Sequence, residues 1–71
     1  MEINVQYARQ AIDEALEKYP QYAANSPRLI ARPLYQGHAL MLDYADPPSR
    51  EDPDAWEFQN AVVKLYKALA L

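Results

Sequence analysis

His38, the single histidine, is followed by Asp43 and Asp46, and these three residues are the combination that comes nearest to a metal or acid–base site. Asp43 follows His38 by five residues. On a helix this spacing would put the two side chains on different faces, and on a strand they would also point to opposite faces. Structural zinc sites draw four ligands mainly from cysteine and histidine, and this chain has no cysteine. We therefore expect His38 to be a surface or hydrogen-bonded residue, with no metal and no cofactor.

The other residues that could do chemistry are better explained by turns and helix caps. Ser26 and Ser49 lie next to prolines, in contexts typical of turns, and neither has a nucleophile-elbow pattern. The segment 51–54 (Glu-Asp-Pro-Asp) offers oxygen ligands but lacks the alternating ligands and the glycine of an EF-hand. The lone glycine, Gly37, excludes a glycine-rich phosphate loop. These patterns indicate a protein that is not an enzyme.

The charge is low and unevenly distributed along the chain. The formal net charge is −3, and residues 43–57 carry six acidic residues against one arginine. This segment is an ordinary solvated loop or, alternatively, an acidic surface for a basic partner. The seven lysines and arginines form no basic stripe, so we expect no nucleic-acid partner. No apolar run approaches the roughly 18 residues of a membrane span, and the first residues do not have the pattern of a secretory signal. We expect a cytoplasmic protein without a membrane partner.

The size and composition predict a single small helical domain, 1–71. The chain has twelve alanines, one glycine, no threonine and only six valines and isoleucines, and this composition favours helices over strands. A core of this size supplies only about 3–5 kcal/mol unless a disulfide, a metal or a partner chain adds to it. Since cysteine is absent, a partner chain is the remaining source, and we expect a homodimer.

Two amphipathic segments predict the main helices, at about 4–19 and 53–70. In the first, Val5, Ala8 and Ile12 begin a 3-4-3-4 apolar spacing, with Asn4 as a possible cap and Pro20 as the end. In the second, Asp52 is a possible cap and Pro53 suits the first helical position. The matched stripes predict that the two helices pack antiparallel.

The middle of the chain, Leu34 to Ala45 above all, allows two interpretations. Residues 39–42 are good helix formers, although Gly37 weakens a first turn. In a β-hairpin, Gln36 and Gly37 could form the turn, with Leu40, Leu42 and Tyr44 on the face opposite to Met41 and Asp43. Because Ile30 is the one β-branched residue in 28–45, propensity favours helix. We therefore predict an all-α fold, two main antiparallel helices joined by an irregular or partly helical middle segment. The alternative is α+β with a central β-hairpin near 29–44.

Aromatic residues suggest where a partner would bind. The last helix has an apolar arc that is too wide for one neighbouring helix, and Trp56, Val63 and Tyr66 lie on its shoulder. Ile3 and Tyr7 form a small second patch on the first helix. Large aromatics in such positions are either buried in the monomer or act as interface anchors. We expect these five residues to bind protein.

No stretch of the chain carries a motif that assigns it to a known family. The function that we expect is therefore that of a small regulatory interaction protein, an adaptor or inhibitor of the kind found among bacterial and phage accessory proteins. The alternative is a small structural subunit of a larger protein assembly.

Overall fold

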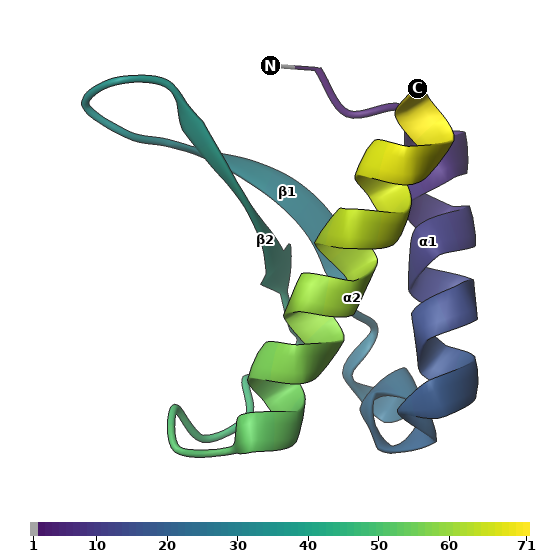
Figure 1. Cartoon of the computed structure of the whole chain (residues 1–71). Helices are drawn as coiled ribbons and strands as arrows, with labels where there is room; N and C mark the ends of the chain where they lie inside the picture. The colour runs from purple at the N-terminus through teal and green to yellow at the C-terminus, as the bar shows by residue number, and fades with distance from the viewer. Residues whose placement is uncertain (1) are drawn as a thin grey trace.

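The computed structural model, which describes residues 2–71, has an α+β fold (Figure 1). Helix α1 (Val5–Lys18) is followed by a 3-10 helix, η1 (Pro20–Asn25), and by the strands β1 (Arg28–Pro33) and β2 (His38–Asp43). Helix α2 (Pro53–Ala70) completes the chain. The prediction of an all-α fold is therefore wrong, and the alternative with a central hairpin describes the molecule.

Both terminal helices form where the sequence predicts them. The side chain of Asn4 accepts hydrogen bonds from the backbone N–H groups of Gln6 and Tyr7, which caps α1. The helix ends before Pro20, and Tyr19 leaves the helical region with φ −125° and ψ 65°. At the start of α2, Asp52 accepts from the N–H of Asp54 at 3.0 Å and Pro53 takes the first helical position.

The middle segment forms a hairpin because its pattern of burial outweighs its helix propensity. In the antiparallel register, Leu29 lies opposite Leu42 and both side chains are buried, whereas Arg28 and Asp43 face solvent. This two-residue alternation is the period of a strand with one buried face. Gly37 closes the loop with φ +94°, a conformation that suits glycine, and the N–H of Leu34 donates to its carbonyl at 2.9 Å.

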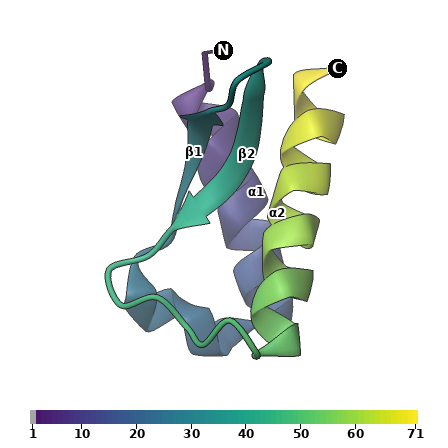
Figure 2. The ribbon, with the colours of Figure 1, turned by 90° about the vertical axis from the view of Figure 1, so that its left-hand side faces the viewer.

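The helices lie side by side and antiparallel, and the hairpin packs on one side of them (Figures 1 and 2). Phe58 and Val62 of α2 are fully buried at the centre of the core. The ring of Phe58 lies 5.0 Å from that of Tyr22 in η1, measured between centroids. α2 therefore has its two apolar neighbours, α1 and the hairpin, inside one chain. No helix in residues 2–71 combines the length and the apolar character needed to span a lipid bilayer.

Candidate protein-binding surface

The structure separates the two aromatic residues that the sequence places together on the shoulder of α2. Tyr66 is only 5% exposed and belongs to the core. Its hydroxyl oxygen accepts a hydrogen bond from the backbone N–H of Asn4 at 3.1 Å, which ties the end of α2 to the start of α1. Tyr66 is therefore a buried residue of the core that is bonded to the residue that caps α1.

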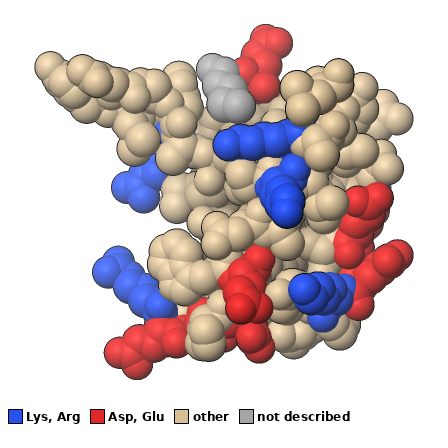
Figure 3. All heavy atoms as spheres, viewed as in Figure 1, with Lys and Arg blue, Asp and Glu red and all other residues tan. Residues whose placement is uncertain are grey.

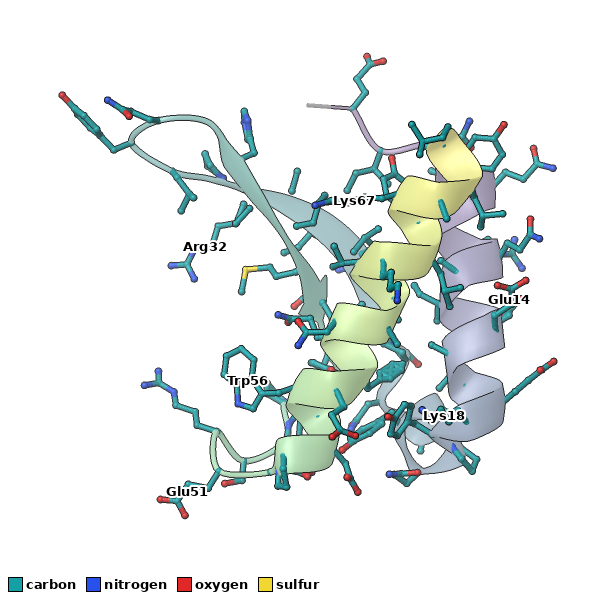
Figure 4. All side chains as sticks on the ribbon, in the orientation of Figure 1. Glu14, Lys18, Arg32, Glu51, Trp56 and Lys67 are labelled. Carbon is teal, nitrogen blue, oxygen red and sulfur yellow. The ribbon has the colours of Figure 1, made fainter. Side chains whose placement is uncertain are left out.

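Trp56, by contrast, is 55% exposed and lies outside the core. Its indole N–H donates to the carbonyl oxygen of Arg50 at 3.0 Å, so the polar atom of the ring already has a partner within the chain. Figure 4 shows Trp56 on the same side of the molecule as the side chain of Arg32, with the loop that carries Glu51 beneath it. This contact gives Trp56 a structural role, which is to hold the loop before α2.

The remaining predicted residues, Val63, Ile3 and Tyr7, are partly buried and pack against the core. Of these, Ile3 also lines a groove on the surface. The five predicted residues therefore do not form one patch, and only Ile3 lies in the groove.

The hairpin has one covered edge and one open edge. Alternate residues of an antiparallel pair turn both backbone groups toward the partner strand, and the others turn them away. The N–H of Leu42 in β2 donates to the side chain of Gln59 on α2 at 3.4 Å. The backbone N–H and C=O of Leu42 therefore point away from β1. Leu29, its direct partner, therefore turns its backbone groups away from β2, and alternation gives Ala31 and Pro33 the same direction.

The edge of β1 remains open in the described part of the chain. The sheet has two strands, and no other backbone or side-chain group of residues 2–71 hydrogen-bonds to the backbone of Leu29 or Ala31. In Figure 2, β2 lies between β1 and α2, and β1 forms the outer side of the sheet. Since Pro33 also points outward, its missing N–H removes no bond of the hairpin.

An apolar groove of about 380 Å³ lies beside this edge. Its apolar lining comes from the start of α1 and the start of β1, namely Ile3, Val5, Ala8, Ile12, Pro27 and Leu29. Val5 remains 70% exposed, although it begins the apolar stripe of α1. Because Ala8, Ile12 and Leu29 are buried, the apolar area that stays accessible in the groove comes mainly from Val5, with the partly buried Ile3 and Pro27.

The charged residues that line the groove are arginines, although Asp13 and Glu14 share a neighbouring surface hollow with Val5 and Arg9. Arg9 and Arg28 line the groove, and Arg32 lies further along β1. From Lys18 to Leu42 the chain has three basic residues and no acidic one. Figure 3 shows acidic side chains at the bottom, along the right-hand edge and at the top of the molecule, whereas the protruding hairpin end has none in this view.

The sequence pattern does not single out most of these residues. Val5, Ala8 and Ile12 belong to the stripe that predicts contact with α2, and Leu29 lies in the segment of uncertain structure. The absence of acidic residues from 18–42 is the signal that could have drawn attention to the hairpin.

Two acidic residues of the segment 43–57 accept hydrogen bonds from tyrosines of the core. Tyr22 donates from its hydroxyl to Asp52 at 2.9 Å, and Tyr19 donates to Glu57 at 3.0 Å. Burial, helped by the bonded Asp52, raises the pKa of Tyr22 from 10.0 to about 12. Burial also raises the pKa of Tyr44. Asp52 therefore caps α2 and anchors η1, so its carboxylate is occupied within the chain.

The residues that suggested chemistry lie apart from one another. His38 begins β2 at the loop end of the hairpin, whereas Asp43 ends β2 and pairs with Arg28 at 2.9 Å. Within residues 2–71, no three His, Asp or Glu side chains are grouped so that they could hold a metal ion. What the described surface offers is an open strand edge, an apolar groove beside it, and the arginines Arg9, Arg28 and Arg32 near both. Comparison with protein-family models, with curated proteins and with solved structures finds no match to this chain, so the surface itself is the basis for a function.

Proposed function

We propose that this chain is a non-enzymatic regulatory protein, an adaptor or inhibitor, that binds another protein at the open edge of β1. The observation that carries the proposal is the combination of outward backbone groups at Leu29 and Ala31 with the apolar groove beside them. An extended segment that adds to a sheet edge gains main-chain hydrogen bonds, and pockets for alternate side chains give specificity.

The groove adds apolar side-chain contacts to the backbone hydrogen bonds that the edge of β1 can make. Exposed edges promote unwanted pairing, and proteins commonly protect them with proline, charge or a covering element. β1 carries Pro33 and two arginines, which restrict pairing, but its first half lies beside apolar side chains of α1. An edge that is restricted at one end and apolar at the other favours a specific partner over general aggregation.

The packing favours a free regulator over a structural subunit that a neighbour must complete. Twelve buried residues form one core: eleven come from α1, η1, both strands and α2, and the twelfth, Tyr19, lies between α1 and η1. In the described residues, every buried side-chain nitrogen or oxygen has a hydrogen-bond partner. A chain with such a core is expected to fold without a different protein, whereas a structural subunit would unfold or aggregate without its neighbour.

Site-directed photo-crosslinking tests the proposal. A photoreactive amino acid replaces Val5, which is exposed at the groove, and the protein is irradiated in a lysate of its source cells. The matched control carries the same amino acid at Lys64, an exposed position on α2. We expect one defined protein adduct from position 5 that is absent from position 64. Equal adducts from both positions, or none from either, would refute binding at this edge.

The remaining expectations stay proposals. The acidic character of the whole chain supports a protein partner rather than a nucleic acid, and we propose a cytoplasmic location. Homodimerisation is still motivated by the small core. The wide apolar arc of α2 no longer argues for a dimer, because α1 and the hairpin of the same chain cover it.

A further inference from the structure

The geometry of β1 determines which side chains of a bound segment would contact the groove and which would contact the arginines. Successive side chains of a strand point to opposite faces. Leu29 is buried on the face toward the helices, so Arg28 and Arg32 share the opposite face with Ile30. A strand added at the edge would therefore turn every second side chain toward the groove and the others toward the arginine face.

The two faces have different chemistry. The groove side presents the exposed Val5 and the partly buried Ile3 and Pro27, which favour apolar side chains. The outer side presents Arg32 and Arg28, and Arg28 also lines the groove together with Arg9. Asp43 neutralises Arg28 in part through an exposed ion pair, whereas no ion pair forms at Arg9 or Arg32 within residues 2–71. Opposite charges on neighbouring strands stabilise their pairing, so acidic side chains fit this face.

A second copy of the chain fits the edge poorly. In a symmetric antiparallel pair centred on Ala31, Pro33 of each copy would lie opposite Leu29 of the other. Since proline has no N–H, the pair would lack two hydrogen bonds. The same pairing would bring four arginines onto one face, and like charges on neighbouring strands are destabilising.

We propose that the open edge of β1 binds an extended segment in which apolar and acidic residues alternate, with the apolar side chains in the groove and the acidic ones against Arg28 and Arg32. This inference rests on the proposed function, because it specifies the partner at the same edge. Ion pairs at such exposed positions are individually weak, so the two arginines together should favour an acidic over a neutral segment by about tenfold in affinity.

The test uses two synthetic peptides of eight residues, one alternating valine with glutamate and one alternating valine with lysine. The isotope-labelled full chain is titrated with each peptide, and the amide resonances are followed by NMR. We expect the glutamate peptide to shift the amides of Leu29 and Ala31, to slow their hydrogen exchange, and to bind at least tenfold more tightly than the lysine peptide.

Three variants separate edge pairing from general attraction. Arg32→Glu should weaken the glutamate peptide and strengthen the lysine peptide, whereas Arg50→Glu makes the same charge change in the loop before α2 and should alter neither by more than about twofold. Ala31→Pro removes an outward N–H and no bond of the hairpin, as Pro33 already does, and it should abolish binding while the circular dichroism spectrum is kept.

The outcomes distinguish the two proposals. Equal binding of both peptides, with shifts at Leu29 and Ala31, would overturn the acidic segment and leave the protein-binding edge intact. Absence of shifts at these amides with either peptide would overturn docking at the edge itself. Contacts between Leu29 of two copies in the unliganded protein, seen in mixed-label NMR samples, would overturn both in favour of self-pairing.

Discussion

Replacing Tyr66 and Trp56 separately tests the placement of the two aromatic residues that the sequence puts on one shoulder of α2. Tyr66 is 5% exposed and Trp56 is 55% exposed, so truncation to alanine should have very different results. Removing a buried aromatic ring costs about 3–5 kcal/mol, from lost apolar burial and from the cavity that remains. Tyr66→Ala also removes the acceptor of the Asn4 N–H.

The expected losses can be compared with the stability of the whole domain. An unstapled core of this size supplies about 3–5 kcal/mol, so Tyr66→Ala removes most or all of it. Trp56→Ala should cost roughly 1–2 kcal/mol, because less than half of the residue is buried and no internal cavity is left. For a domain of 60–100 residues, each kcal/mol corresponds to about 4–8 °C in Tm.

Circular dichroism with thermal unfolding measures both effects. Tyr66→Ala should be largely unfolded at 25 °C, whereas Trp56→Ala should keep its helical signal and melt roughly 5–15 °C lower than the original chain. Tyr66→Phe is the matched control: it keeps the ring and loses one hydrogen bond, at about 0.5–1.5 kcal/mol. A folded Tyr66→Ala with an unchanged Tm would refute the burial of Tyr66. An unfolded Trp56→Ala would show that Trp56 belongs to the core.

Three other predictions follow from the structure. The raised pKa of Tyr22 means that its contribution to stability is complete below pH 10 and is lost as the pH rises through about 12. In urea unfolding, Tyr22→Phe should be less stable than the original chain at pH 7 by about 1 kcal/mol, because one hydrogen bond is lost. This difference should close and then reverse between pH 10 and pH 12, since burial disfavours the phenolate, and a difference independent of pH would contradict the prediction. Light scattering behind a sizing column at tens of micromolar should show a dimer, because the small core has no disulfide to support it. A monomer of high thermal stability would refute homodimerisation. His38→Ala should leave the Tm and the crosslinking from position 5 unchanged, because His38 is exposed at the end of the hairpin. Loss of the crosslinked adduct in a folded variant would show that His38 takes part in binding.

Local signals in the sequence were sufficient for the helices because each one acts within a few residues. Asn4 and Asp52 cap backbone N–H groups two or three positions away, and Pro20 blocks the continuation of α1. The apolar spacing of α2 also predicts its buried side correctly at Phe58 and Val62. Its width correctly requires two neighbours, without saying what the second one is.

The hairpin and the binding surface were decided by tertiary structure. Residues 39–42 have good helix propensity, but the burial of Leu42 opposite Leu29 fixes a strand, and that contact joins residues thirteen positions apart. The same packing buries Tyr66 and leaves Val5 and the edge of β1 open. The periodicity of a short apolar segment does not predict which element of the fold covers it, because burial depends on elements that are distant in the sequence. The sequence by itself therefore determined where the helices begin and end, and the folded chain alone determined which apolar surface is left for a partner.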